Sequence, residues 1–297
     1  MIVVTAPTGQ IGHQVLDHLL ARNAPVRVIS RDPSRLPAET RERIEVVEGS
    51  HGDSDVVTEA FDGADAVFWL VPADPRALSV EAAYVGFSGP ACKALEHHRV
   101  ARVVGVSALG RTTAPAGAAG NVTASLAMDD LIASTGVHYR ALTMPSFMDN
   151  IARQAALIKN EGRFTSPISG DRKLPSCATQ DVATVAAGLL IDTSWTGVAE
   201  VPLLGPQDLS FDDMARIMSE VLRRPIRFQQ VPGPAYQDRM MRAGMSEAMA
   251  EGMLAMALAK DAGLDNGVAR TPETGTPTSF RAWCEEVLKP AVLGTQG

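Results

Sequence analysis

Short apolar segments alternate with longer segments of helical pattern along the first half of the chain. The segments predicted to be strands are residues 2–5, 25–30, 44–48, 65–71, 101–106 and 138–143. The segments predicted to be helices are residues 9–22, 54–62, 79–98 and 122–135. Strands that alternate with helices predict βαβ crossovers, and therefore a doubly wound, parallel α/β sheet.

The pattern becomes less regular after residue 150. The predicted helices there are residues 151–162, 181–192, 208–223, 234–260 and 278–288, and the predicted strands are 198–204 and 226–231. Gly, Pro and Ser residues in the stretch 163–178 predict a loop. We therefore predict a main domain over residues 1–150, to which elements of 179–205 return. Residues 151–297 are expected to form mainly a smaller C-terminal α/β subdomain.

The turn after the first strand has the sequence Thr5-Ala6-Pro7-Thr8-Gly9-Gln10-Ile11-Gly12 and leads into the first helix. A pyrophosphate binds at such a turn because small residues let the backbone approach it at the helix N-terminus. Ala6 replaces the first glycine of the motif, and we expect its φ to stay negative. The context predicts a Rossmann dinucleotide site, with a plain strand-to-helix turn as the alternative. The predicted contacts are Thr8, Gly9, Gln10, Ile11 and Gly12.

The end of the second predicted strand distinguishes the two nicotinamide dinucleotides. An NAD site usually places a carboxylate there, whereas Ser30 ends this strand and Arg31 follows, with Arg35 one turn later. Guanidinium groups suit a 2′-phosphate, so NADP(H) is the predicted cofactor. Asp32 lies near the spacing of the NAD carboxylate, but it precedes Pro33 and is interpreted as an N-cap. Arg31 as an ordinary solvated charge is the alternative.

The carboxyl ends of the other predicted strands contribute further candidates, because these ends border the cofactor crevice of an open parallel sheet. Val71 and Pro72 follow the fourth strand, and Ser107 follows the fifth. Ser107 either hydrogen-bonds a substrate carbonyl or the nicotinamide amide, or it only closes the strand's backbone bonds. Asp53, after the third strand, either contacts the cofactor near its adenine or caps the next helix.

Composition and charge narrow the choice of partners. The 297 residues carry a net charge of −7, which argues against nucleic acid and anionic membrane surfaces. No apolar run approaches the roughly 20 residues of a membrane span, and the apolar start lacks the basic region of a signal peptide. The widely spaced Cys92, Cys177 and Cys284 favour a reducing cytoplasm, core positions for these residues and no metal site.

Several segments, in the right order along nearly the whole chain, resemble one family. They include V-V-G-V-S-A-L-G at residues 103–110 and also cover 4–12, 27–33, 63–72, 129–150, 181–183 and 205–215. This set is similar to the NmrA-like proteins, atypical short-chain dehydrogenase/reductases. That family includes NADPH-dependent quinone oxidoreductases, triphenylmethane-dye reductases and dinucleotide-sensing regulators. The resemblance implies that Pro145, Ser146, Phe147 and Asn150 lie beside the nicotinamide.

The chain departs from the wider superfamily at the proton-donating Tyr-x-x-x-Lys pair. Asn121 and Ser125 stand at the matching positions, so no general acid is evident. Hydride transfer to a conjugated acceptor needs less help from an acid, because the negative charge is delocalised. We therefore predict an NADPH-dependent oxidoreductase acting on a quinone or enone, with Ser107 and Asn150 as candidate catalytic residues. A non-catalytic NADP(H) sensor that binds a partner is the alternative.

The expected substrate is a small, apolar, conjugated molecule, and a homodimer is left open. The candidate substrate contacts are Tyr84, Phe147, Met245 and Met249. The five methionines from Met241 to Met256 recur every three or four residues in the predicted helix 234–260, so they are expected to share one face. That face is either a core-facing stripe or an adaptable lid over a flat substrate. Core packing is likewise the alternative for Tyr84 and Phe147.

Overall fold

The computed structural model describes residues 1–294, which form two compact units. Unit 1 comprises residues 1–107, 124–143 and 182–201. Unit 2 comprises residues 108–123 and 144–181 and continues from residue 202. Both units are therefore built from segments that are separated in the sequence, and the domain division near residue 150 stays a proposal.

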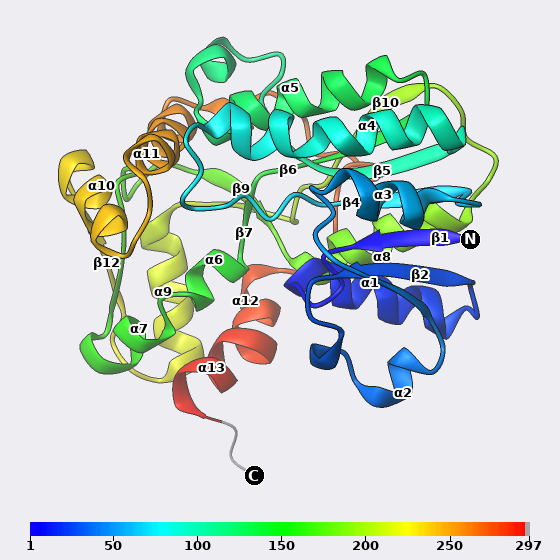
Figure 1. Ribbon diagram of the computed structural model, residues 1–297. Helices are drawn as coiled ribbons and strands as arrows, with labels where there is room; N and C mark the ends of the chain where they lie inside the picture. Colours follow the sequence, from blue (N-terminus) through cyan, green and yellow to red (C-terminus); the bar gives the residue numbers. More distant parts are fainter. Residues whose placement is uncertain (295–297) are drawn as a thin grey trace. The chain divides into compact units, whose positions relative to one another are not determined.

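Unit 1 is built on a seven-stranded sheet in the order β10-β6-β5-β4-β1-β2-β3 (Figure 1). Its strands are β1 (Ile2–Thr5), β2 (Val26–Ser30), β3 (Glu45–Glu48), β4 (Ala66–Trp69), β5 (Arg102–Ala108), β6 (His138–Met144) and β10 (Val198–Pro202). The pairs β1–β2, β1–β4, β2–β3 and β4–β5 are parallel. The predicted doubly wound α/β fold is confirmed.

Position in the sheet explains the composition of each strand. All four residues of β1 and of β4 are buried, as expected for interior parallel strands that helices cover on both faces. In β3, at the edge, only Val47 is buried and two glutamates face solvent. The apolar runs of the central strands therefore follow from burial on both faces.

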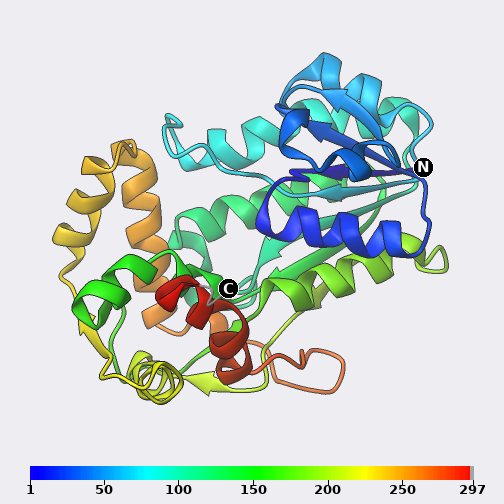
Figure 2. The same cartoon turned by 90° about the horizontal axis from the view of Figure 1, so that it is seen from below.

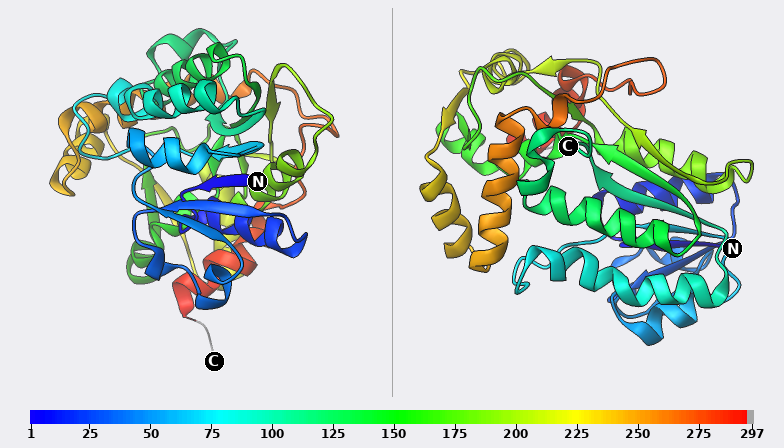
Figure 3. Two further views of the ribbon diagram at one scale, coloured as in Figure 1. Left: turned by 45° about the vertical axis from the view of Figure 1, so that its right-hand side comes forward. Right: turned by 90° about the horizontal axis from the view of Figure 1, so that it is seen from above.

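Helices cover both faces of this sheet. They are α1 (Gln10–Ala21), α2 (Ala38–Arg41), α3 (Ser54–Phe61), α4 (Phe87–His98), α5 (Asn121–Ser134) and α8 (Thr179–Ile191), with a 3₁₀ turn at Pro33–Arg35. Helices α1 and α8 cover one face (Figure 2). The Thr184 hydroxyl oxygen of α8 lies 3.2 Å from the His18 Nε2 of α1. Helices α3, α4 and α5 pack on the other face, in one core with Trp69 and Phe61 (Figure 3).

Two helices contain a wider π-helical segment, and a proline explains each one. The segment Ala82–Gly86 precedes α4, and Pro90 lies four residues after Gly86. The segment Cys284–Leu288 precedes α13 (Lys289–Leu293), which contains Pro290. Proline has no N–H for the carbonyl four residues earlier and its ring crowds that carbonyl, so the local turn widens. The predicted helix 79–98 therefore contains a π-helical segment and is not α-helical throughout.

Unit 2 contains two small sheets and the remaining helices. The strands β7 (Ser146–Phe147), β9 (Leu174–Cys177) and β11 (Asp208–Leu209) form one sheet, and β8 (Arg163–Ser166) pairs with β12 (Arg227–Gln230). The helices are α6 (Asp149–Ala152), α7 (Ala155–Glu161), α9 (Phe211–Leu222), α10 (Gly233–Arg242), α11 (Glu247–Asp261) and α12 (Phe280–Trp283), with 3₁₀ turns at Ala114–Ala118 and Leu264–Asn266. The predicted loop 163–178 is wrong, because it contains both β8 and β9.

The predicted single helix 234–260 is also wrong. Gly244 has φ +93°, and the side chain of Ser246 accepts a hydrogen bond from the Met249 N–H and starts a new helix. The chain therefore forms α10 and α11 with a turn between them, and Met245 lies in that turn. The methionines do not share one face: Met241 is exposed, whereas Met249 is buried.

Cys92, Cys177 and Cys284 are all free and buried, as predicted. Burial raises the pKa of the Cys92 and Cys284 thiols to about 12, and it raises the pKa of Cys177 further. All three therefore carry a proton at neutral pH. In residues 1–294 no helix has both the length and the apolar character that a membrane crossing requires.

The turn between β1 and α1 is held by backbone contacts. Ala6 has φ +49°, so the expectation of a negative φ is wrong. The left-handed conformation points the Ala6 carbonyl toward α1, where it accepts a hydrogen bond from the Gly9 N–H at 3.0 Å. A side chain on Gly12 would place its Cβ only 2.0 Å from that carbonyl oxygen. Glycine at position 12 is thus required by the backbone of the turn.

Replacing Ala6 with glycine is expected to raise the free energy of unfolding by about 0.5–1 kcal/mol. The left-handed conformation costs an alanine about 1–2 kcal/mol, and a glycine avoids this cost. Part of the gain is lost, because glycine has a larger backbone entropy in the unfolded chain. Chemical denaturation of Ala6→Gly against the parent protein measures the difference. The matched control is Ala38→Gly in the helical residues of α2, which should destabilise the protein. Equal losses in both variants would contradict this account of the turn.

Candidate functional site

The N-terminus of α1 has no cap from the side chain of its N-cap residue. That residue is Gly9, in an extended conformation. First-turn N–H groups of a helix have no intrahelical partner, and the helix dipole adds partial positive charge. Gly9 and Gln10 are exposed and Thr8 is half-buried, whereas the Ile11 side chain is buried in the core. Ile11 can therefore meet a ligand only through its backbone.

Thr5 fixes the position of this turn on the sheet. Its buried Oγ1 donates a hydrogen bond to the Phe68 carbonyl at 2.9 Å and accepts one from the Leu70 N–H at 3.0 Å. These bonds join the carboxyl ends of β1 and β4, where the strand order of the sheet reverses. Ligands of open α/β sheets bind at that point. Sequence reasoning missed this role, although a polar residue ending an apolar strand was the available signal.

The end of β2 presents positive charge. Ser30 is buried, whereas Arg31 and Arg35 are exposed. The Asp32 carboxylate accepts hydrogen bonds from the Ser34 N–H at 3.1 Å and from the Ser34 hydroxyl at 2.5 Å. It caps the 3₁₀ turn that begins at Pro33, so the N-cap interpretation is confirmed. The carboxylate that follows this strand directly in the sequence is therefore engaged in a cap.

His51 follows β3 in the sequence and is buried beside the end of β4. It is 6% exposed, and its ring packs edge-on against Trp69 and Phe87, with centroids 5.2 and 4.9 Å apart. Its Nε2 lies 3.0 Å from the Leu70 carbonyl, which can only accept, so Nε2 carries a proton. Burial lowers the pKa of His51 to about 4, with a smaller effect of the Arg31 charge in the same direction. His51 is thus a neutral support for the sheet edge.

The remaining candidates of unit 1 lie near strand ends, apart from Tyr84, which lies in a helix. Asp53 is exposed at the N-cap position of α3, but its side chain makes no cap bond. Val71 is half-buried and Pro72 is exposed after β4, and Tyr84 is half-buried in the π-helical segment. Ser107 is buried near the end of β5 and donates a hydrogen bond to the Asp129 carboxylate.

The other candidates belong to unit 2, and their place in a site stays a prediction. Pro145 is buried, Phe147 is half-buried in β7 and Asn150 is exposed on α6. The neighbouring Asp149 has a structural role, because its carboxylate accepts hydrogen bonds from the Thr179 N–H at 3.2 Å and the Trp283 indole at 3.4 Å.

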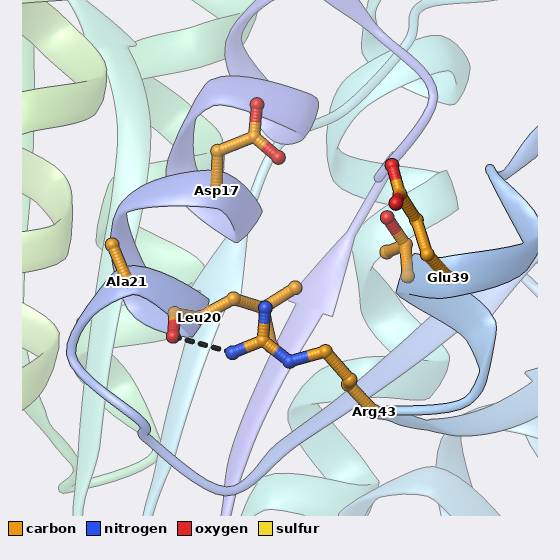
Figure 4. A pocket seen from close by; sticks show the side chains of 6 residues that line it. Asp17, Leu20, Ala21, Glu39 and Arg43 are labelled. Atoms are coloured by element: carbon orange, nitrogen blue, oxygen red, sulfur yellow. Dashed lines mark hydrogen bonds between the residues drawn. The ribbon is translucent and has the colours of Figure 1, made fainter.

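A cavity of about 330 Å³ in unit 1 lies away from the glycine turn. Figure 4 shows Asp17 on α1 and Glu39 and Arg43 from the α2 region around it, with Arg43 donating a hydrogen bond to the Leu20 carbonyl at 2.7 Å. The cavity borders the C-terminal half of α1, whereas the predicted dinucleotide site lies at the opposite end of this helix, near Gln10.

His51 is expected to make stability depend on pH between about 6.5 and 4. In this range the unfolded chain binds a proton that the folded protein excludes, so stability is highest above pH 6.5 and falls as the pH approaches 4. The loss is up to about 3 kcal/mol. Gln keeps a donor for the Leu70 carbonyl but does not titrate, so His51→Gln should lose this part of the pH dependence.

Urea denaturation of both proteins at several pH values tests this expectation. The exposed His13 provides the matched control, and His13→Gln should follow the parent protein. If His51→Gln and the parent protein lose stability in parallel from pH 7 to 4, the histidine is not the titrating group.

Comparison with known proteins identifies the family of the chain. The sequence profile of the NAD(P)H-binding family matches residues 7–193. The chain is 29% identical over 96% of its length to (4-alkanoyl-5-oxo-2,5-dihydrofuran-3-yl)methyl phosphate reductase of Streptomyces griseus, covering 97% of that protein. It is 25% identical to the NAD(P)H azoreductase of Xenophilus azovorans, covering 85% of each chain.

A solved structure agrees with these sequence matches. The triphenylmethane reductase of Citrobacter, complexed with NADP(H), superimposes with a TM-score of 0.79 at 20% identity, over 99% of this chain and 100% of that one. The resemblance to NmrA-like reductases seen in the sequence is confirmed. The match to residues 7–193 covers more than half of the chain and includes the α1 turn, the end of β2 and Ser107. The chain belongs to the NAD(P)H-binding family.

Proposed function

We propose that this protein is an NADPH-dependent reductase that transfers hydride to a small conjugated acceptor such as a quinone or an enone. The observation that carries the proposal is the pairing of a helix N-terminus with glycine as its N-cap, at Gly9 of α1, and the exposed Arg31 at the end of β2. The bound dinucleotide supplies the hydride, and the residues of the chain bind and orient it.

Unit 1 fits the dinucleotide at two places. The open turn at Gly9 suits a pyrophosphate, because backbone N–H groups and the helix dipole favour an anion there. Arg31 and Arg35 suit the 2′-phosphate that distinguishes NADPH from NADH, since a guanidinium binds phosphate through paired hydrogen bonds. The cap formed by Asp32 supports this preference, because one oxygen of its carboxylate is engaged by Ser34.

The acceptor class is proposed from the chemistry that the chain lacks and from its relatives. Asn121 and Ser125 stand where a Tyr and a Lys would donate a proton, so an acceptor that spreads the incoming charge is favoured. The substrate named for the Streptomyces relative carries a ring double bond conjugated with two carbonyl groups. An azo group, the target named for the Xenophilus relative, is likewise part of a conjugated system.

A dinucleotide-sensing protein that binds a regulatory partner is the second candidate. The missing Tyr and Lys favour it equally, because a sensor has no need of a proton donor. Turnover separates the two: a reductase oxidises NADPH when a conjugated acceptor is added, and a sensor binds NADPH without consuming it.

Arg31→Ala is expected to weaken NADPH binding by about 10- to 100-fold, the range for losing a charged hydrogen bond. NADH lacks the 2′-phosphate, so its affinity should change by less than about threefold. Calorimetric titration with both dinucleotides gives the two ratios, and absorbance at 340 nm with a panel of quinones and enones measures turnover.

The control is Arg41→Ala, which removes an exposed arginine of α2 from the same unit and should leave both affinities unchanged. Equal weakening of NADPH and NADH by Arg31→Ala would place the 2′-phosphate elsewhere. Tight NADPH binding without turnover of any acceptor would favour the sensor.

A further inference from the structure

Three side chains of unit 1 form a buried hydrogen-bond network near the carboxyl end of β5. Ser107 donates to one oxygen of the Asp129 carboxylate, and the Tyr139 hydroxyl donates to the other at 2.6 Å. Asp129 is 3% exposed, Tyr139 is 1% exposed and Ser107 is 7% exposed. Both carboxylate oxygens are therefore occupied by hydroxyl protons in a site from which water is largely excluded.

Gly105 explains how the tyrosine reaches this position. A Cβ on Gly105 would lie 2.2 Å from the Tyr139 hydroxyl oxygen and 2.8 Å from its ring. The absence of a side chain on β5 thus creates the space for the Tyr139 hydroxyl, which comes from β6. Asp129 projects from α5, so strands β5 and β6 and helix α5 together fix the network.

The network determines what Ser107 can offer to a ligand. A serine hydroxyl has one proton and two lone pairs, and here the proton is directed at Asp129. The Ser125 hydroxyl oxygen, which is also buried, lies 3.5 Å from the Ser107 hydroxyl oxygen. In this arrangement Ser107 can accept a hydrogen bond from a ligand but cannot donate one to a carbonyl.

The register of the sheet places Ser107 at the ligand edge. Trp69, the last residue of β4, pairs with Gly105, so β5 extends beyond the end of its neighbour at Ser107. This edge contains the carboxyl ends of the strands on which ligands of such sheets bind. The buried network is thus connected to the site through a single hydroxyl group.

We infer that Asp129 is a positioning residue that holds Ser107 as a hydrogen-bond acceptor for the carboxamide NH₂ of the nicotinamide. The inference rests on the proposed function. Ser107 then contacts the cofactor and not a substrate carbonyl, and it is not the proton donor of the reduction. Tyr139 donates to the second carboxylate oxygen, so the first oxygen stays directed toward Ser107.

A dinucleotide that lacks the donor tests this inference. In the 3-acetylpyridine analogue of NADPH a methyl group replaces the carboxamide NH₂, while the carbonyl is kept. The parent protein should bind NADPH about tenfold more tightly than the analogue, the value of one hydrogen bond. Ser107→Ala should reduce this ratio to about one. Because each ratio is measured within one protein, a general loss of stability does not change it.

Asp129→Asn tests the positioning role. The amide has one acceptor oxygen for two hydroxyl protons. Tyr139 is the more deeply buried of the two donors, so the oxygen stays with Tyr139 and the NH₂ group turns to Ser107. The Ser107 proton then points outward, and the ratio should fall to about one or below. Thr143→Val is the matched control, because it removes a buried hydroxyl of β6 outside the network; its ratio should stay near ten.

Each outcome of these titrations decides the question. Equal binding of the two dinucleotides by the parent protein would overturn this inference and leave the proposed function standing. A ratio in Asp129→Asn as high as in the parent would overturn the positioning role of Asp129. If the parent bound neither dinucleotide, the inference and the proposed function would both be overturned. Circular dichroism confirms that each variant is folded.

Discussion

The close approach of α1 to the end of β1 is the constraint on which this edge of the sheet depends. Gly12 has room for no side chain, because the Ala6 carbonyl oxygen occupies the position of a Cβ. That carbonyl points toward the helix because Ala6 adopts a left-handed conformation, and the Thr5 hydroxyl joins the same turn to β4. The direction of the first helix and the opening of its N-terminus both follow from these few backbone contacts.

Burial and pairing of polar groups then determine which charges remain at this edge. His51 is neutral because it is enclosed by aromatic rings, Asp32 is engaged as a cap, and Asp129 receives two hydroxyl protons. Arg31 remains exposed at the end of β2. The proposed site combines Arg31 near β2 with Ser107 as an acceptor near β5, and this pair suits a ligand with a phosphate at one end and an amide at the other.

Much of unit 1 could be predicted from sequence because its signals are local. Each central strand is an apolar run, and each glycine or N-cap of a turn lies within a few residues of the element it controls.

Unit 2 was less predictable for a physical reason. Strand β8 pairs with β12, more than 60 residues away, and β9 pairs with β11, so the polar composition of residues 163–178 gave no sign of either strand. The Asp129–Tyr139 pair was missed because its members lie on different elements, and the space left by Gly105 on a third element is visible only in the folded protein.

The burial of the three cysteines has a consequence for a protein proposed to handle electrophiles. Quinones and enones alkylate thiolates readily, and a thiol reacts in this way only when it is both accessible and deprotonated. Cys92, Cys177 and Cys284 are buried and protonated at neutral pH. The folded chain therefore presents no soft nucleophile at these positions, and it can encounter such compounds repeatedly without being modified there.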